Sequence, residues 1–340
     1  MTVGKRDTTS SKSTRYAWGY FIFASMIGFQ YVFAQSISAD DNQPIWKLAP
    51  EVIRDKVNSG VRAGASLKPA AWPNGAKAAV SISFDLDTEA LWLGFYKQSS
   101  ASYISRGVYG PRVGMPRILK LLDKHDVPAT FFTPVMSMML HPETLQHILA
   151  RPRHELAFHS YVHESVVEFK GNEERETYQK ALTKFTELTG KRPVGFRSGA
   201  WDLTEQTLDI VKELGFLYDS SLMADDDPYM IMSAGVASGI VELPIEWMLT
   251  DTPFFQGQWV NRLSPVKPTA EVFSIWAEEF DAAYRDGGMF ILVLHPQVIG
   301  RRARIAMLDR LITHMKAKSG GVWFATHEQI ARHVLEGSNE

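Results

Sequence analysis

Residues 82–89 read Ile-Ser-Phe-Asp-Leu-Asp-Thr-Glu and place two carboxylates, Asp85 and Asp87, directly after an apolar run. In an extended strand, residues i and i+2 point to the same face. We therefore expect both carboxylates to lie side by side where a buried strand ends. Neighbouring buried carboxylates repel, so a proton, an arginine or a metal ion has to neutralise one of them. The pattern indicates a functional site at this strand end.

Short apolar strands alternate with helices along most of the chain, which is typical of parallel βαβ units. The number of units fits a single β/α barrel; the rival is an open doubly wound sheet, but no Gly-x-Gly-x-x-Gly follows the first strand. Residues 89–110 are expected to form a long polar and aromatic loop. The expected strands are 78–84, 128–132, 156–158, 194–197, 216–219, 240–243, 289–294 and 322–324. The expected helices include 142–149, 173–188, 204–214, 269–285, 302–318 and 328–335.

The N-terminal segment indicates export. Four basic residues precede the apolar run 16–33, and small residues follow near position 34. This order predicts a signal peptide over 1–34; an uncleaved membrane anchor and an internal core segment are the alternatives. Residues 35–76 are expected to be a linker arm with one short helix near 53–61, and residues 77–337 the catalytic barrel. Either a signal peptide or an uncleaved anchor predicts that the bulk of the protein is periplasmic or secreted.

The composition excludes several classes of function. The formal net charge of −2 gives no reason to expect a nucleic-acid partner. The chain has no cysteine, which excludes disulfides, thiolate metal sites and cysteine nucleophiles. No Gly-x-Ser-x-Gly elbow is present, so the sequence does not favour a serine hydrolase. No membrane partner is expected beyond the N-terminal segment, and a homo-oligomer remains open.

His159 and His163 follow an expected strand and flank Ser-Tyr-Val. If the chain turns helical there, the two imidazoles lie at i and i+4 on one face and can share a divalent cation. Asp87 would complete a set of two nitrogens and one oxygen, with coordination left open as in a catalytic site. The alternative is a chance pair of surface histidines.

His295 and Arg197 also stand at the C-terminal ends of expected strands, where β/α barrels carry their active sites. His295 has the pKa range of a general acid, and its alternative is a hydrogen-bonded structural histidine. A guanidinium near Asp85 would keep that carboxylate ionised, whereas the alternative for Arg197 is a surface arginine. Residues 225–227 form an acidic run, expected to be a solvated loop that borders the pocket at most. The other histidines are interpreted as structural or exposed: His125, His141, His147, His154, His314, His327 and His333.

Five motifs occur in order: Phe-Asp-Leu-Asp (84–87), His-Ser-Tyr-Val-His (159–163), Phe-Arg-Ser-Gly-Ala-Trp (196–201), Tyr-Asp-Ser-Ser (218–221) and Leu-Val-Leu-His-Pro (292–296). Over 72–333 the chain resembles the polysaccharide deacetylase family, also called the NodB-homology or carbohydrate esterase family 4 proteins. The finer resemblance is to a branch that includes peptidoglycan-deacetylase-like proteins, allantoinase-like proteins and cyclic imide hydrolases. Gly199 and Phe158 depart from the branch's common residues, which puts the groove and the support of the first histidine in doubt.

This resemblance implies a distorted (β/α)7 barrel and a metal-dependent hydrolase, usually with zinc. Asp85 would be the general base, Arg197 its orienting partner and His295 the general acid. Asp87, His159 and His163 would be the metal ligands. The expected substrate contacts are Trp247, Asp219, Ser220, Arg112, Arg301 and Trp92.

The expected substrate is an N-acetylated amino sugar in peptidoglycan or a chitin-like glycan. A cyclic imide or allantoin-type ring, opened with the same residues, is the alternative. It is favoured if the aromatic segments 91–109 and 247–259 wall the pocket. The third hypothesis is a glycan-binding barrel without activity.

Overall fold

The computed structural model of the protein describes residues 44–256 and 266–337. The chain divides into two units, residues 1–48 and residues 49–340. In the first unit, the described residues contain one short helix, Ile45–Lys47 (η1). The expected signal segment lies outside the described residues. In the part of the chain that is described, no helix is both long and apolar enough to span a bilayer.

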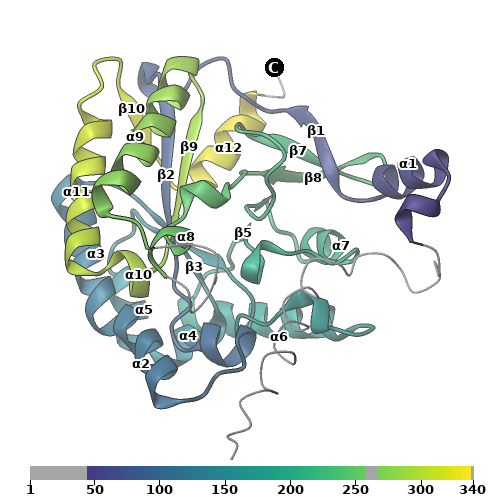
Figure 1. Cartoon of the computed structure of the whole chain (residues 1–340), viewed down its shortest axis with the longest axis horizontal. Coiled ribbons are helices and arrows are strands. Elements are labelled where there is room, and N and C mark those ends of the chain that lie inside the picture. Colours follow the sequence, from purple (N-terminus) through teal and green to yellow (C-terminus); the bar gives the residue numbers. More distant parts are fainter. Residues whose placement is uncertain (1–43, 257–265, 338–340) are drawn as a thin grey trace, which may run out of the picture. The chain divides into compact units, whose positions relative to one another are not determined.

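The second unit is built on parallel strands in the order β9-β2-β3-β4-β5-β6-β8 (Figure 1). Thr250 forms a parallel bridge with Val293 of β9 at the remaining seam, beyond β8. The expected distorted (β/α)7 barrel is therefore confirmed, with an incomplete closure between β8 and β9. The bounds are Ala78–Asp85 (β2), Thr130–Thr133 (β3), Glu155–Phe158 (β4), Gly195–Phe196 (β5), Tyr218–Asp219 (β6), Val236–Glu242 (β8) and Met289–Leu294 (β9).

Three further strands extend the sheet. Val322–Phe324 (β10) pairs with the first residues of β2. Tyr229–Ser233 (β7) pairs antiparallel with β8, and Arg62–Ser66 (β1) pairs antiparallel with β7. The linker arm was expected to hold only a short helix, so β1 corrects that expectation. Its small and exposed residues give no apolar alternation from which a strand can be predicted.

Helices cover the strands, and glycines end two of the longest where a left-handed residue is needed. Gly190 (φ 72°) follows α6 and Gly287 (φ 69°) follows α9. The bounds are Pro50–Ser59 (α1), Ala101–Tyr109 (α2), Met115–His125 (α3), Val135–Leu140 (α4), Pro142–Leu149 (α5), Glu173–Thr189 (α6), Thr207–Glu213 (α7), Thr252–Phe255 (α8), Thr269–Asp286 (α9), Pro296–Ile299 (α10), Arg302–Lys316 (α11) and His327–Gly337 (α12).

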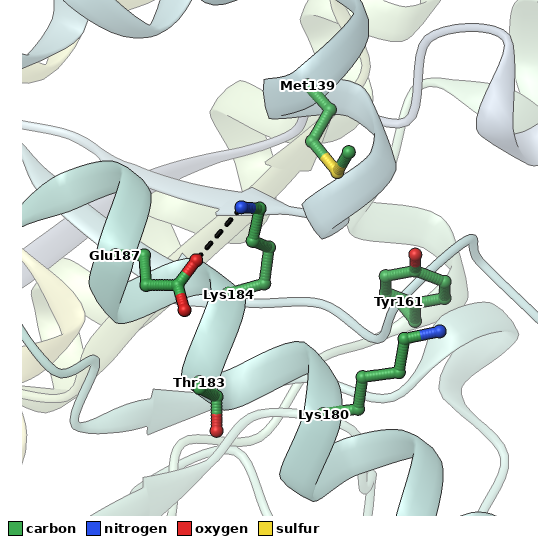
Figure 2. Close-up of a pocket in the computed structure, with 6 residues that line it drawn as sticks. All are labelled: Met139, Tyr161, Lys180, Thr183, Lys184 and Glu187. Atoms are coloured by element: carbon green, nitrogen blue, oxygen red, sulfur yellow. Dashed lines mark hydrogen bonds and ion pairs between the residues drawn. The ribbon is translucent and has the colours of Figure 1, made fainter.

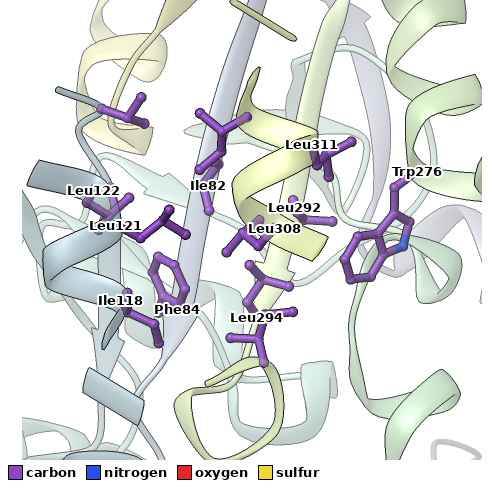
Figure 3. Packing of buried hydrophobic residues seen from close by; sticks show 14 of the residues in the cluster. Ile82, Phe84, Ile118, Leu121, Leu122, Trp276, Leu292, Leu294, Leu308 and Leu311 are labelled. Atoms are coloured by element: carbon purple, nitrogen blue, oxygen red, sulfur yellow. The ribbon is translucent and has the colours of Figure 1, made fainter. Parts of the chain in front are cut away.

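The largest cluster of buried apolar side chains packs α3, α9 and α11 against β2 and β9 (Figure 3). Ile82 and Phe84 of β2 point into this cluster beside Leu292 and Leu294 of β9. Because side chains alternate along a strand, Ser81, Ser83 and Asp85 are directed to the barrel interior. The core therefore fixes which face of β2 carries the polar side chains.

The segment 89–110 is helical, and the expectation of a loop there is wrong. It forms a π-helical turn, Leu91–Phe95 (η3), and then α2. The rings of Tyr96 and Tyr103 each lie 5.1 Å from the ring of Trp92. Packing among these aromatic rings stabilises helical turns in a segment whose sequence lacks a clear apolar period.

The acidic run 225–227 lies away from the site. Asp227 accepts a hydrogen bond from the backbone N–H of Met289 at 2.9 Å, and its other oxygen pairs with Lys68 at 2.8 Å. Met289 is the first residue of β9, so Asp227 sits at the N-terminal end of the barrel strands. The run is therefore the solvated loop that the sequence predicts, and the alternative that it borders the pocket is excluded.

Acid should destabilise the fold through His154, whose Nδ1 accepts the N–H of Ala129 at 3.2 Å. Burial lowers the pKa of His154 to about 4. The unfolded chain therefore binds a proton that the folded chain excludes, and stability falls as pH drops from about 6.5 toward 4. His154→Asn should reduce this loss by on the order of 1–2 kcal/mol, with allowance for partial exposure. Urea unfolding at pH 7 and pH 4.5 measures it. His147→Asn, at an exposed position of α5, is the control; equal losses in both variants would contradict the assignment.

Candidate active site

The two carboxylates at the end of β2 lie together, as their spacing predicts. Asp85 is the last residue of β2, and both it and Asp87 are 1% exposed. Nε2 of His159 is 4.0 Å from an oxygen of Asp85 and 3.6 Å from an oxygen of Asp87. Nε2 of His295 is 3.9 Å from Asp85 and 3.8 Å from Asp87. The strand therefore delivers both carboxylates to one buried point between two imidazoles.

His159 and His163 meet through a tight turn, and the expected helix is absent. Ser160 and His163 have positive φ angles of 70° and 57°. The Ser160 hydroxyl accepts the N–H of His163, and Glu164 accepts the N–H groups of Tyr161 and Val162. The two imidazole rings lie 5.0 Å apart and almost perpendicular. The predicted pairing is therefore correct, but a polar turn produces it.

Asp87, His159 and His163 fit a divalent metal ion. Their ligand atoms lie within 4.8 Å of one another, and in the described residues this is the one such group of three. Both oxygens of Asp87 and Nε2 of His159 are buried without a hydrogen-bond partner. Nδ1 of His159 donates to the carbonyl of Arg197 at 2.8 Å, which leaves the Nε2 lone pair directed at Asp87. Burial raises the pKa of Asp87 to about 8, and a bound cation is the partner that would keep it ionised.

Asp85 has a different partner. Nη1 of Arg197 donates to Asp85 at 2.6 Å, and the guanidinium lies 3.8 Å over the ring of Phe132. Burial alone would raise the pKa of Asp85, but the charges of Arg197, His159 and His295, with the hydrogen bond from Arg197, together outweigh burial and hold that pKa below its usual range. Arg197 is fully buried, and Ser83 and Ser220 accept three of its other N–H groups. The surface alternative for Arg197 is excluded.

Asp251 supports His295, and the sequence analysis missed it. Nδ1 of His295 donates to Asp251 at 2.7 Å, and the backbone N–H of His295 donates to the same carboxylate at 3.0 Å. Burial alone would lower the pKa of His295, but the charge and hydrogen bond of Asp251, with the charges of Asp87 and Asp85, raise it to about 9. His295 can therefore carry a proton at neutral pH and present Nε2–H to the site. Asp251 lies in no motif with His295, and only its place after an aromatic segment hinted at a role.

His327 is a second residue that the sequence analysis did not place at the site. It is fully buried, and its Nε2 accepts from Nη2 of Arg197 at 3.3 Å, so its Nδ1–H donates to Ser81 at 2.8 Å. Burial and the charge of Arg197 hold the pKa of His327 well below its ordinary value. A neutral imidazole therefore completes the ring of acceptors around Arg197.

The expected substrate contacts divide into buried and exposed groups. Trp92 is 2% exposed, and Asp219 and Ser220 are hydrogen-bonded inside the protein. Trp247 is 44% exposed and lies 4.5 Å from the ring of Trp201. Arg112 and Arg301 are exposed, and the Arg301 guanidinium lies 3.5 Å over the ring of Tyr109. Only the exposed residues are open to a ligand without rearrangement.

A hollow of about 330 Å³ lies on the outer side of the histidine turn, between α4 and α6 (Figure 2). Lys184 pairs there with Glu187 at 2.9 Å, and the ammonium of Lys180 lies 4.7 Å over the ring of Tyr161. Its lining contains none of the six residues predicted for catalysis and metal binding. The hollow is therefore separate from the reactive groups.

Known proteins share this fold and these motifs. The sequence profile described as polysaccharide deacetylase matches residues 109–218. A peptidoglycan deacetylase of Helicobacter pylori is 31% identical over 284 residues, which cover 76% of this chain and 96% of that protein. The chain belongs to the polysaccharide deacetylase family. It is thus a hydrolase of carbon–nitrogen bonds other than peptide bonds.

Two solved structures agree with this membership. A structure from Mycobacterium smegmatis, described as a polysaccharide deacetylase, has a TM-score of 0.72 and 36% identity, and the match covers 82% of this chain and 96% of that one. The allantoinase PuuE has a TM-score of 0.68 and 28% identity, and the match covers 77% and 91%. The deacetylase fold and the allantoinase fold are therefore both close to this chain.

Metal content should separate the two carboxylates. Asp87→Asn, His159→Ala and His163→Ala each change a residue of the candidate metal group, and we expect each variant to bind zinc at least tenfold more weakly than the unaltered protein. Asp85→Asn should retain the metal, because Asp85 is held by Arg197. Titration of metal-stripped protein with zinc, followed by calorimetry, measures the affinities. Equal loss of zinc affinity in Asp85→Asn and Asp87→Asn would overturn the assignment.

Proposed function

We propose that the protein is an exported, zinc-dependent enzyme that removes the N-acetyl group from an amino sugar of peptidoglycan or a chitin-like glycan. One observation carries this proposal: the paired carboxylates are unequal, since Arg197 holds Asp85 at 2.6 Å while Asp87 faces two imidazoles at 3.6 and 3.8 Å. One carboxylate is thus free to act on a proton while the other faces the proposed metal. The Helicobacter pylori relative, described as a peptidoglycan deacetylase, supports the substrate class.

The residues divide the reaction between two proton carriers. Asp85, ionised by Arg197, takes a proton from the attacking water. His295 holds a proton on Nε2, fixed by its Nδ1–H bond to Asp251, and gives it to the departing amine nitrogen. The bond from the carbonyl carbon to the water oxygen forms and the carbon–nitrogen bond breaks, which yields acetate and the free amine. A zinc ion bound by Asp87, His159 and His163 would polarise the scissile carbonyl and lower the pKa of the attacking water.

Zinc is proposed because of the donor set. Two imidazole nitrogens and one carboxylate match the three protein ligands of catalytic zinc sites, with a position left for substrate. The hydrogen bond from Nδ1 of His159 to the Arg197 carbonyl is the supporting contact that metal-bound histidines ordinarily make. Hard cations such as magnesium prefer all-oxygen sites and fit this set less well.

The exposed residues around the site are proposed as substrate contacts. Trp247, packed against Trp201, offers an apolar ring face on which a sugar can stack. Arg301 and the exposed Arg112 offer cationic groups to a carboxylate of the substrate. We assign the buried Trp92, Asp219 and Ser220 to support of the pocket wall and of Arg197, and not to direct contact.

Opening of a cyclic amide is the second candidate, and the allantoinase structure with 28% identity favours it. Close packing beside the histidine turn also supports a small substrate. Phe95 of η3 lies 6.0 Å edge-on from the ring of His163, and an added Cβ at Gly94 would be 1.9 Å from the carbonyl oxygen of Val162. The helical segment after β2 is thus packed directly against the metal-ligand turn.

The complete set of catalytic groups argues against a barrel without activity.

A product assay on the zinc-loaded protein distinguishes the two substrates. We expect acetate release from N-acetylglucosamine oligomers or peptidoglycan fragments and no opening of allantoin or cyclic imides. Chelation should abolish acetate release, and zinc should restore it. Ring opening without acetate release would replace the leading proposal with the second one.

Asp85→Asn tests the proposed base. The amide cannot accept the proton of water, and we expect kcat to fall at least about 100-fold with zinc still bound. Asp226→Asn, in the exposed loop at the far end of the strands, is the matched control and should keep full kcat. Substantial turnover by Asp85→Asn would remove the base role from Asp85.

A further inference from the structure

Asp219 and Glu242 form a second pair of buried carboxyl groups that the reaction does not use. They are partners in the parallel pairing of β6 with β8, and their side chains are 1% and 0% exposed. Each carboxyl group acts on the pKa of the other. Within the described residues, Oδ2 of Asp219 and Oε2 of Glu242 have no donor. Two acceptors therefore face each other in the protein interior.

The other oxygen of each carboxyl group is fully engaged. Oε1 of Glu242 accepts the N–H groups of Ser221 and Leu222 at 3.0 and 2.9 Å. Oδ1 of Asp219 accepts the hydroxyl of Ser221 at 2.6 Å. Each donor that bonds to the pair thus points at Oε1 or Oδ1, and in the described residues the nearby hydroxyls of Tyr178 and Tyr229 have no hydrogen-bond partner. The facing oxygens need a donor of their own, since two bare carboxylates in contact and away from water repel strongly.

The surrounding charges decide which acid holds a proton. The charge of Arg197 lowers the pKa of Asp219, whereas the leading influences on the pKa of Glu242 are burial and Asp219. The hydroxyls of Tyr178 and Tyr229 also lie near the pair. Glu164 and Asp225 act on those two hydroxyls. Burial first, and then the neighbouring Asp219, raise the pKa of Glu242 well above its ordinary value. Ionisation therefore favours Asp219, and the proton belongs on Glu242.

We propose that Glu242 is a neutral acid in the native enzyme, that its Oε2–H donates to Oδ2 of Asp219, and that this bond positions Arg197. The proposed catalytic role of Asp85 depends on Arg197, so the kinetic part of the inference rests on the proposed function. Glu242 touches neither the metal ligands nor the reacting atoms, and is a positioning residue.

Two contacts connect the pair to Arg197. Ser221, held by Asp219, accepts the backbone N–H of Ser198 at 2.9 Å, next to Arg197 in the chain. Ser220, between the two held residues, accepts Nε of Arg197 on its carbonyl and Nη2 on its hydroxyl, both at 2.8 Å. That hydroxyl donates to the carbonyl of Leu243, directly after Glu242. The pair thus fixes both the backbone and the acceptors of Arg197, and through Arg197 the position of Asp85.

Replacement of Glu242 by glutamine and by leucine tests the proposal. Glutamine reproduces the neutral acid, because its carbonyl accepts from Ser221 and Leu222 while its N–H donates to Asp219. We expect Glu242→Gln to keep kcat within about twofold and an unchanged melting temperature. Glu242→Leu leaves those donors and Asp219 unpartnered; we expect kcat to fall 10–100-fold, as for lost support of a site, with KM little changed and zinc content intact.

Glu155→Gln is the matched control for a buried glutamate. Thr130, Tyr218 and the N–H of Glu328 all donate to Glu155 at 2.8–2.9 Å, at the opposite end of the strands. Glutamine keeps one acceptor oxygen for these three donors, so we expect a melting temperature lower by several degrees with kcat preserved. If Glu242→Gln instead loses as much kcat as Glu242→Leu, Glu242 acts as an anion or a cation ligand, and the proposal is overturned.

Infrared spectroscopy gives a readout that needs neither substrate nor a stable leucine variant. The zinc-loaded protein at neutral pH should show the carbonyl stretch of a buried protonated carboxyl group, and the difference spectrum between the unaltered protein and Glu242→Gln should contain this band. Absence of the band in the unaltered protein would overturn the proposal. The spectrum is independent of turnover. Failure to hydrolyse any glycan would therefore count against the proposed function, whereas the protonation of Glu242 would still be tested by the spectrum.

Discussion

The site depends on the repulsion between two carboxylates that one strand buries together. β2 places Asp85 and Asp87 at 1% exposure, where both cannot remain bare anions without a partner. The fold gives each a different partner. Arg197 donates to Asp85 at 2.6 Å, and His159 and His163 present ring nitrogens to Asp87 at 3.6 and 3.8 Å. Two identical side chains thereby acquire different chemistry from their surroundings alone.

The barrel makes this division possible because its parallel strands end at one edge. Asp85, His159, Arg197 and His295 each end or directly follow a different strand, and they come from parts of the sequence more than 200 residues apart. Two of the histidines also have a buried partner that accepts the Nδ1 proton: Asp251 for His295 and the Arg197 carbonyl for His159. We propose that Asp219 and Glu242 likewise hold a proton in a fixed place. They act farther from the reaction, by positioning Arg197.

The sequence predicted what local periodicity and short motifs determine. The spacing of Asp85 and Asp87 shows their common face because strand side chains alternate at every second residue. The form of the turn at His159 could not be predicted, because positive φ angles at Ser160 and His163 are rare for such residues and leave no composition signal. Asp251 and His327 were missed because their partners lie 44 and 130 residues away in the chain, and nothing local records such contacts. The strand β1 could not be predicted from the sequence, because its pairing with β7, and not its own side chains, makes it a strand.

The most direct test of the unequal carboxylates is an anomalous-scattering map of crystals grown with zinc. The account predicts one zinc peak bonded to Asp87, His159 and His163, with Asp85 unbonded to zinc and still paired with Arg197. A peak bridged by both carboxylates, with Arg197 released from Asp85, would contradict it.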